Sequence, residues 1–139
     1  MIIDVMLDRN AKMPSKAYKG DAGYDIYCPC SINVLAHNSA VIDTGVHMII
    51  PEGYVGMVKS KSGLNTMKDL TCEGVVDSGY TGSIVIKMYN NGKNDYHFDD
   101  GDKLTQIVIM PIPETELRQV YSLPKTDRGN RGFGSSGVR

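Results

Sequence analysis

The sequence lacks the features of several specialised protein classes. It has only three cysteines, an odd number, and Cys28 and Cys30 are too close together for a standard zinc-binding pair, so we expect reduced thiols. It lacks a charge imbalance: 15 basic and 16 acidic residues leave a net charge of −1, which argues against a binder of nucleic-acid polymers or membranes. No apolar run approaches the ~18 residues of a membrane span, and the N-terminus has neither a basic lead nor a long apolar core. We expect a cytoplasmic protein.

Long helical periodicity is also nearly absent, whereas short apolar runs separated by Gly, Pro, Asn and Asp recur throughout. The length of 139 residues fits one domain, and a hydrophobic share of 41% against 22% charged residues argues against disorder. The pattern therefore predicts an all-β domain, either a β-sandwich or a jelly roll. The expected strands are residues 2–7, 24–35 with a break at Pro29, 40–50, 54–60, 83–90, 95–98, 103–112 and 117–121.

One short helix is expected from Ser62 to Leu70, with Ser62 at its N-cap and Leu64 and Met67 on its apolar side. Lys59, Ser60 and Lys61 come immediately before it. Two ammonium groups, a hydroxyl and the free N–H groups of a helix start are the parts of an anion site. The same residues fit a capped surface helix with solvated lysines, and the fragment alone leaves both interpretations open.

Residues 71–83 contain an acid and an aromatic ring between glycines. The glycines at positions 74, 79 and 82 allow positive φ or the close approach of a ligand. Asp77 and Tyr80 lie at the mouth of the turn, so we expect a hairpin that holds a ligand. Taken alone, the stretch fits an ordinary hairpin with a turn acid and a half-buried tyrosine slightly better.

Two further polar residues occur inside predicted strands. An acid at Asp25 is disfavoured in a strand unless it has a partner or a function, and carboxylates beside a phosphate site suit Mg²⁺. Asp21, four residues earlier, fits this role or that of a simple turn residue. Strand alternation puts Gln106 on the face of Leu104 and Val108, where its amide needs a ligand or a neighbouring backbone as partner.

Residues 125–139 form a basic tail rich in glycine. Such a composition usually gives a disordered end. Arg128, Ser135 and Ser136, however, offer donors for phosphate oxygens, and Phe133 offers a ring that can stack on a base. The tail therefore also fits a mobile arm that becomes ordered over a bound nucleotide.

Five short motifs, in order between residues 22 and 137, together resemble the five motifs of the trimeric dUTPases. They are AGYD at 22–25, KSGL at 61–64, GVVDSGYTG at 74–82, GDKLTQ at 101–106 and RGNRGFGSSG at 128–137. The resemblance implies an all-β jelly-roll subunit with one short helix that assembles as a homotrimer. It implies a core domain at 1–124 and an arm at 125–139 that closes over the active site. The implied activity is hydrolysis of dUTP to dUMP and pyrophosphate with Mg²⁺, at sites that each draw on all three chains.

The resemblance also implies a role for each matching residue. Asp77 would orient and activate the water that attacks the α-phosphorus, and the cation of Lys61 would neutralise charge on the phosphates. Tyr80 would pack under the deoxyribose and exclude a 2′-hydroxyl, while Asp25 would bind Mg²⁺ through water. The other implied substrate contacts are uracil recognition by the hairpin at Thr71, Gly74 and Val76, phosphate binding by Ser62, Gly63 and Gln106, γ-phosphate binding by Arg128, Gly134 and Ser135, and stacking of Phe133 on uracil.

The sequence departs from the family pattern at three positions. Lys61 replaces a usual arginine, and a lysine makes a point-charge contact instead of a bidentate fork. Thr71 stands where asparagine is frequent, which leaves uracil recognition to the backbone. Arg131 replaces a usual glycine in the tail, where it would alter the path of the arm or add a phosphate contact.

Two alternatives to a dUTPase fit these motifs less well. A dCTP deaminase of the same fold resembles Arg-Ser-Ser instead of Lys-Ser-Gly in the phosphate motif and needs a glutamate base, for which Glu73 is the only nearby residue. A nucleotide-gated regulatory binding protein would not need the apparent catalytic acid, Asp77, which is intact here.

Overall fold

Alternation of apolar and polar residues builds the strands of this protein. In β9 (Val85–Asn90), Ile86, Met88 and Asn90 are buried while the residues between them are exposed, because successive side chains of a strand point to opposite faces. A computed structural model describes residues 1–137. The remaining strands are β1 (Val5–Leu7), β2 (Tyr24–Tyr27), β3 (Ile32–Val34), β4 (Ser39–Asp43), β5 (Val46–Met48), β6 (Tyr54–Lys59), β7 (Leu70–Thr71), β8 (Glu73–Val76), β10 (Tyr96–Phe98) and β11 (Lys103–Pro111), and the helix is α1 (Ser62–Lys68).

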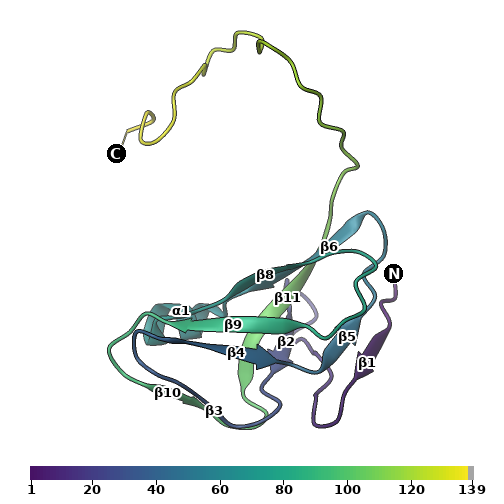
Figure 1. The fold of residues 1–139 in the computed structure, drawn as a ribbon, viewed down its shortest axis with the longest axis vertical. Helices are drawn as coiled ribbons and strands as arrows, with labels where there is room; N and C mark the ends of the chain where they lie inside the picture. The colour runs from purple at the N-terminus through teal and green to yellow at the C-terminus, as the bar shows by residue number, and fades with distance from the viewer. Residues whose placement is uncertain (138–139) are drawn as a thin grey trace.

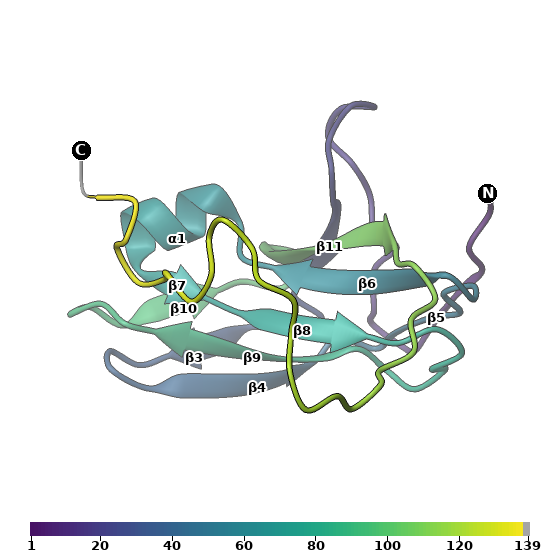
Figure 2. The same cartoon turned by 90° about the horizontal axis from the view of Figure 1, so that it is seen from above.

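The strands form two main layers that enclose the core. One layer is a four-stranded sheet in the order β2-β11-β6-β8, and the other is a three-stranded sheet in the order β4-β9-β7. Two-stranded ribbons, β1-β5 and β10-β3, complete the body, and all of these pairs are antiparallel (Figures 1 and 2). Fully buried residues such as Ile26, Leu104 and Ile107 from the first sheet and Ile42 and Met88 from the second fill the space between. The expected all-β sandwich with one short helix is confirmed.

The helix is shorter than expected. It starts at Ser62 with Lys61 as the N-cap residue, which makes no side-chain capping bond, so the assignment of Ser62 as N-cap was wrong. It ends at Lys68 because Asp69 adopts a left-handed conformation with φ of 57° and its N–H bonds the carbonyl of Leu64. Of the expected apolar stripe, Leu64 packs against the core whereas Met67 is exposed.

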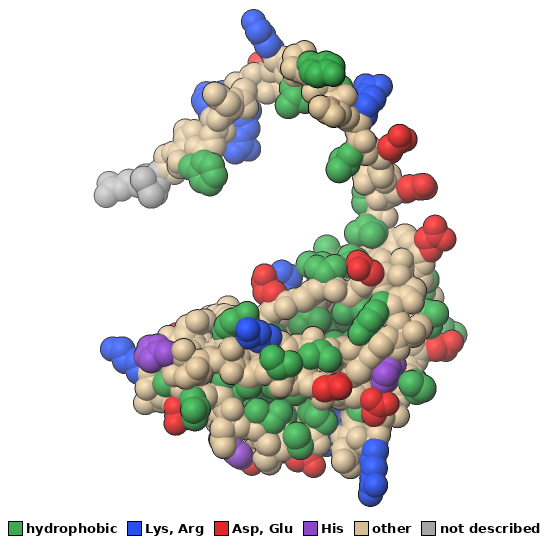
Figure 3. All heavy atoms as spheres, viewed as in Figure 1, with side chains coloured by type: hydrophobic (Ala, Val, Ile, Leu, Met, Phe, Trp, Pro, Cys, Tyr) green, Lys and Arg blue, Asp and Glu red, His purple; other side chains and the backbone are tan. Residues whose placement is uncertain are grey.

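The expected strand at 40–50 is interrupted, and the one at 117–121 does not form. The first is divided into β4 and β5 by a corner at Thr44 and Gly45, where Gly45 has a φ of 66°. Residues 112–137 carry no strand, and every side chain among them is exposed. Figures 1 and 3 show this segment leaving the end of β11 and arching away from the body. A strand needs a neighbour for its backbone groups, and beyond Ile112, whose N–H bonds the carbonyl of Gly53, this segment has none among residues 1–137.

All three cysteines are free, as expected, with Cys28 and Cys72 buried and Cys30 exposed. Burial raises the pKa of the Cys28 thiol to about 11, so this thiol is held in its neutral form. No helix within residues 1–137 has the length and apolar character needed to cross a membrane.

Candidate functional site

The expected hairpin at 71–83 forms only at its base. Leu70 and Thr71 of β7 pair with Asn90 and Tyr89 of β9, but the chain then leaves this sheet, and β8 pairs with β6 in the other layer. The crossing point is Cys72, whose N–H donates to the Ser60 hydroxyl oxygen at 3.0 Å. The two extended runs therefore belong to different sheets and diverge. An open cavity of about 480 Å³ lies at this point, lined by Ser60, Asn65, Thr71, Cys72, Glu73 and Tyr89.

The turn after β8 presents the carboxylate of Asp77 to solvent. Gly79 takes a φ of 76°, which a residue with a Cβ adopts only at a cost, and its N–H donates to the carbonyl of Ile50 at 3.1 Å. The N–H of Tyr80 donates back to the carbonyl of Asp77 at 3.3 Å. Among residues 1–137, no side chain or backbone group bonds the Asp77 carboxylate, so both of its oxygens are open to a ligand.

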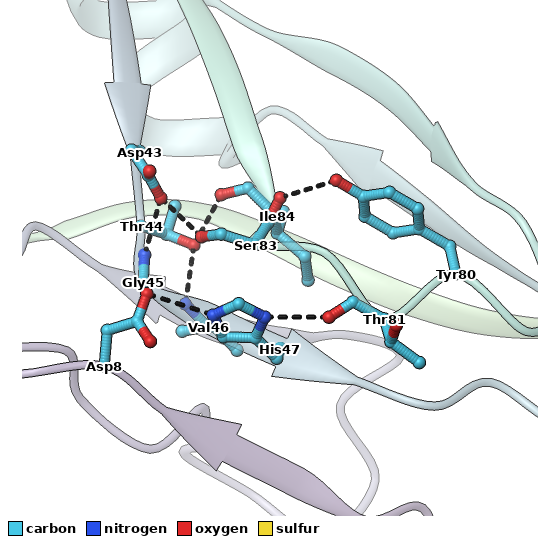
Figure 4. Close-up of polar contacts among 10 residues, drawn as sticks. All are labelled: Asp8, Asp43, Thr44, Gly45, Val46, His47, Tyr80, Thr81, Ser83 and Ile84. Atoms are coloured by element: carbon cyan, nitrogen blue, oxygen red, sulfur yellow. Dashed lines mark hydrogen bonds and ion pairs between the residues drawn. The ribbon is translucent and has the colours of Figure 1, made fainter.

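Tyr80 lies across the end of the same turn. Its hydroxyl donates to the carbonyl of Ser83 at 3.0 Å, and its side chain is half-exposed (Figure 4). The ring packs on Gly82, where an added Cβ would lie 2.5 Å from Cζ of Tyr80. Only glycine at position 82 leaves room for the ring in this place. The same turn thus carries an exposed acid and a half-exposed aromatic ring.

A second group of predicted site residues gathers at the other end of β6. In the register of the four-stranded sheet, Gln106 of β11 lies opposite Asp25 on one side and Lys59 on the other. Asp25 is buried, and both of its oxygens accept bonds from lysines: Lys61 binds Oδ1, and Lys103 binds Oδ2 at 2.7 Å. The structure thus brings together the residues predicted from three separate motifs. Lys103 joins this group although it was not a predicted site residue. Its partner, Asp25, lies 78 positions away in the sequence, and the GDKLTQ motif contains Lys103 without indicating this contact.

The orientation expected for Gln106 was wrong in one respect. A bulge in β11 between Lys103 and Thr105 interrupts the alternation, so that Leu104 and Thr105 are both buried. Gln106 therefore lies on the opposite face from Thr105 and Ile107, which line the core. Its amide N–H donates to the carbonyl of Ser60 at 3.2 Å, and it packs on Gly23, where a Cβ would lie 2.6 Å from Oε1. The neighbouring backbone is thus its partner.

The charges around Asp25 set its ionisation. Burial acts to raise the pKa of this carboxyl, but hydrogen bonds and charge attraction from Lys103 and Lys61 outweigh it and hold the pKa below its usual value. The same contact raises the pKa of Lys103. Asp25 is therefore an anion near neutral pH, matched by two ammonium groups.

Replacing Asp25 with Asn is expected to remove stability at neutral pH but little in acid. Because the folded pKa lies below the unfolded value of about 4, Asp25 contributes stability above that pH and loses it as the pH falls through the folded pKa. Since the lysines are partly exposed, the difference at pH 7 is about 1–3 kcal/mol, less than for a fully buried pair. Urea unfolding of both proteins at neutral and acidic pH measures it. Glu52→Gln, at an exposed carboxylate, is the control, and a D25N difference that does not shrink in acid contradicts the assignment.

Mg²⁺ normally keeps several waters and takes one or two carboxylates together with substrate phosphates. Within residues 1–137, no cluster of three acidic, histidine or cysteine side chains is arranged to hold a metal ion. Of the two acids considered for Mg²⁺, Asp21 accepts a bond from the N–H of Tyr18 at 2.9 Å in its own turn, whereas Asp25 lies beside Lys61 and Gln106. This set fits a cation that arrives with a phosphate chain, and it does not fit a site made by protein ligands alone.

The two groups of residues are apart within one chain. Val76, next to Asp77, pairs with Gly56 at one end of β6, whereas Lys59 at the other end leads to Lys61. Three strand residues already separate these points by roughly 10 Å. The structure thus assembles the predicted site in two separate parts.

The tail lies apart from both groups. Arg128 and Arg131 each donate from Nε to the other's carbonyl oxygen at 3.1 Å, so this part of the tail folds on itself. Phe133 is fully exposed with a φ of 39°, and the Ser135 N–H bonds the carbonyl of Gly132 at 3.1 Å. Figure 1 shows the tail well away from β6 and β8. The part of the predicted arm at 138–139 lies outside the described residues.

Sequence reasoning also missed a polar network behind the turn. Ser83 donates to the carboxylate of Asp43, Thr44 donates from Oγ1 to the carbonyl of Ile84 at 2.6 Å, and His47 contacts the carbonyl of Thr81 at 2.8 Å (Figure 4). These residues come from the β4–β5 corner, far from the turn in sequence. No motif or spacing in the sequence indicates such contacts.

Comparisons with known proteins agree on one family. The family model described as dUTPase matches residues 9–137. Deoxyuridine 5′-triphosphate nucleotidohydrolase of swinepox virus is 36% identical over 135 residues, which cover 96% of this chain and 95% of the relative. The protein of the same name from Cutibacterium acnes is 37% identical over 130 residues, covering 91% and 86%.

Solved structures give the same answer. A Staphylococcus bacteriophage 80alpha dUTPase, a G164S mutant with dUpNHpp, superposes with a TM-score of 0.92 at 33% identity and covers 99% of both chains. A dUTPase from phage phi11 of S. aureus, a D95N mutant described with a structural Mg(II) ion, superposes with a TM-score of 0.83 at 33% identity and covers 90% of this chain and all of its own. With its five motifs, its β-sandwich and these relatives, the chain belongs to the dUTPase family.

Proposed function

We propose that this protein hydrolyses dUTP to dUMP and pyrophosphate. The observation that carries the proposal is the exposed carboxylate of Asp77, presented on the Gly79 turn that also carries Tyr80. Its support is the match of the dUTPase model to 9–137 and a likeness to phage dUTPases solved with a dUTP analogue. The other residues of the five motifs are assigned to the remaining contacts with the substrate.

In the proposed reaction, Asp77 orients a water molecule and accepts its proton as the oxygen bonds to the α-phosphorus. The bond from the α-phosphorus to the bridging oxygen breaks, and pyrophosphate leaves with the electron pair. A carboxylate suits this role because its basic oxygen can accept the proton of the attacking water. Tyr80, with its hydroxyl held by Ser83, offers a rigid wall for the sugar that would reject a 2′-hydroxyl.

The phosphate end of the substrate is assigned to the second group. Lys61, Ser62, Gly63 and Gln106 would bind phosphate oxygens, and Asp25 would hold Mg²⁺ through water. In this structure Lys61 is bound to Asp25, so the lysine must turn toward the phosphates when the nucleotide enters. Lys103 would then remain on Asp25 as its counter-ion. When bound, Mg²⁺ supplies charge neutralisation for the leaving pyrophosphate.

Uracil recognition is assigned to the divergent strands at 71–77. Their backbone N–H and carbonyl groups beside Thr71, Gly74 and Val76 can pair with the base, because β8 and β9 belong to different sheets. The Thr71 hydroxyl accepts a bond from the amide of Asn91 at 3.2 Å, which fixes its position. The cavity at this crossing is lined by Thr71 and Tyr89 among others.

The active protein is proposed to be a homotrimer in which each site uses parts of several chains. Two observations support this: Asp77 lies at the opposite end of β6 from Lys61, and the tail contacts neither group within residues 1–137. Apolar side chains along the exposed segment, Leu117, Tyr121 and Leu123, also fit contacts with another subunit (Figure 3). The core at 1–124 would form the trimer, and the arm at 125–139 would close over a site with Arg128, Gly134 and Ser135 at the γ-phosphate and Phe133 on the base.

The proposal is tested by incubating the protein with dUTP, dCTP, dTTP and UTP in turn, each with Mg²⁺, and assaying pyrophosphate and ammonia. Pyrophosphate from dUTP alone is the expected result. Ammonia from dCTP would replace the proposal with a deaminase. Tight binding of a non-hydrolysable dUTP analogue without turnover of dUTP would replace it with a regulatory binding protein.

Replacing Gly82 with Ala is expected to weaken the preference for dUTP over UTP. The new Cβ occupies the place of the Tyr80 ring, which must move and release its bond to Ser83. Displacement of a substrate-positioning group on this scale lowers kcat/KM for dUTP by roughly tenfold to a hundredfold. Steady-state rates with both nucleotides measure the change. Gly20→Ala is the control, because a Cβ there meets nothing within 4 Å, and an unaltered dUTP/UTP ratio in G82A contradicts the role of Tyr80.

A further inference from the structure

His47 joins the turn that carries Asp77 and Tyr80 to Asp8, in the turn that follows β1. Its Nδ1 lies 2.8 Å from the carbonyl oxygen of Thr81, and its Nε2 lies 3.0 Å from Oδ2 of Asp8 (Figure 4). We propose that the doubly protonated ring of His47 is a positioning group for this turn, so that turnover of the nucleotide falls when His47 loses a proton. The proposal rests on the proposed function, because it concerns the same site.

The partners of His47 determine the protonation state that fits. A carbonyl oxygen and a carboxylate oxygen are both acceptors, so both ring nitrogens must donate. The imidazolium has two N–H groups and satisfies both contacts. Neutral imidazole has only one N–H, and its bare nitrogen would then face an oxygen lone pair. Loss of the proton therefore breaks one of the two bonds and sets a repulsive contact in its place.

The charges that surround His47 favour the imidazolium. Asp8 faces it from the turn after β1, and Asp43 faces it from the end of β4. The turn itself offers the neutral carbonyl of Thr81, and the hydroxyl of Tyr80 is bonded to Ser83. The hydrogen bond to Asp8, and then the one to Thr81, raise the pKa of His47 above its ordinary value of about 6.5, whereas desolvation opposes them. The hydrogen bonds of His47 to Asp8 and Thr81 are therefore both present below this raised pKa, and one of them is lost as the pH rises through it.

His47 holds the one part of the turn that lacks another anchor. At one end, the Gly79 N–H is bonded to Ile50. At the other end, Ser83 is bonded to Asp43, and Ile84 exchanges bonds with the backbone of Thr44 and Val46. Between these ends, the only hydrogen bond within residues 1–137 from the turn's middle to the rest of the protein is the one from His47 to Thr81. Because Thr81 adjoins Tyr80 and Gly82, loss of the bond from His47 to Thr81 frees the segment on which the Tyr80 ring rests.

The chain offers a matched control at His97. This residue lies on β10, with Nδ1 2.6 Å from Oδ1 of Asn33 and Nε2 3.0 Å from Oδ1 of Asp99. His97, like His47, is a strand histidine that contacts a carboxylate. It belongs to the β10-β3 ribbon, which carries none of the proposed site residues. Substitution of His97 tests for general effects of removing a histidine–carboxylate pair.

The first experiment follows the ring and backbone directly by NMR in the wild-type protein, with ¹⁵N-labelled imidazole and amides. We expect both His47 nitrogens to carry protons on the acid side of its titration, and this titration to be accompanied by shifts of the Tyr80 and Gly82 amides. In Asp8→Asn the same titration moves to lower pH, because the neutral amide no longer favours the charged ring. A His47 titration that does not move to lower pH in D8N, or amides that do not follow the titration, would overturn the proposal. This readout needs no turnover, so it is independent of the proposed function.

The second experiment measures kcat/KM for dUTP from about pH 5.5 to 9 in wild type, H47Q, D8N and H97Q. The wild type and H97Q are expected to lose roughly tenfold on the alkaline side as one charge-assisted hydrogen bond is lost. H47Q lacks this step, because a glutamine keeps one donor at every pH, and D8N shows it at lower pH. An H47Q profile with the wild-type step, or an H97Q profile without it, sinks the proposal. Absence of dUTP turnover in the wild type contradicts the proposed function, while the NMR result still decides the role of His47.

Discussion

Replacement of Asp77 with Asn is expected to lower kcat for dUTP by about 10²–10⁴-fold while leaving the affinity for a non-hydrolysable dUTP analogue nearly unchanged. The size of the effect follows from the chemistry, because an amide has no basic oxygen that can accept the proton of the attacking water. The shape is preserved, because Asn and Asp are isosteric and the turn is held by backbone bonds from Gly79 and Tyr80 that the substitution does not touch.

Single-turnover kinetics and calorimetric titration with the analogue separate the chemical step from binding for this variant. Glu73→Gln is the matched control, since Glu73 lies on the adjoining strand β8 and is paired with Lys59 on the surface at 3.1 Å. E73Q is expected to retain a near-normal rate. The same variant addresses the deaminase alternative, in which Glu73 would be the base. A D77N enzyme with a normal rate would require another residue as the base.

The body of the fold was predictable where local alternation reports burial. The strands β6 and β9 lie almost where the short apolar runs at 54–60 and 83–90 predict them, and the turns between strands coincide with Gly, Pro, Asn and Asp. The prediction failed where strand formation depends on a neighbouring strand and not on the sequence of the segment itself. Residues 117–121 have a strand-like composition but no neighbouring strand among residues 1–137, so they form no strand and stay exposed.

The bulge in β11 shows a second limit of sequence reasoning. One extra residue between Lys103 and Thr105 reverses the faces of the residues that follow, so Gln106 does not share the face of Leu104, as alternation predicted, and its amide bonds Ser60. Nothing in the GDKLTQ motif distinguishes a bulged strand from a regular one. Its outcome is nevertheless what brings Gln106 into line with Asp25.

The candidate site was predictable as a set of residue types and not as a set of contacts. Motif order identified Asp25, Lys61 and Gln106 as belonging together, and the register of β2, β11 and β6 places them together. The direct pairing of Asp25 with Lys61 was not foreseen, because each was assigned to a different part of the ligand. It changes the expected order of events: the lysine must exchange a carboxylate for a phosphate when the substrate binds. His47 had no sequence signal, because its two partners lie 39 and 34 positions away and depend on tertiary contact.

Truncation after Asp127 is expected to reduce dUTP turnover by about 10²–10³-fold without disrupting the assembly. The removed residues include Arg128, Phe133 and Ser135, which are all exposed and make no contact with the body, so the core loses no packing. What is lost is a set of donors proposed to neutralise the γ-phosphate. Turnover assays and sedimentation of the truncated protein measure both quantities. R128Q should reproduce a large part of the loss, whereas R118Q, an exposed arginine before the arm, should not.

A mixture of two proteins, the one truncated after Asp127 and the full-length D77N variant, provides the sharpest test of a shared active site. Each protein alone lacks one essential part, but a mixed trimer can contain a site with Asp77 from a truncated chain and the arm from a D77N chain. In an equimolar mixture with random exchange, about a quarter of the sites receive both parts, so activity should rise far above that of either parent. Mass-tagged subunits verify that exchange has occurred. Exchange without recovery of activity would mean that the acid and the arm at each site come from the same chain, and Asp77 and Arg128 would then have to meet by folding of the tail back onto its own body.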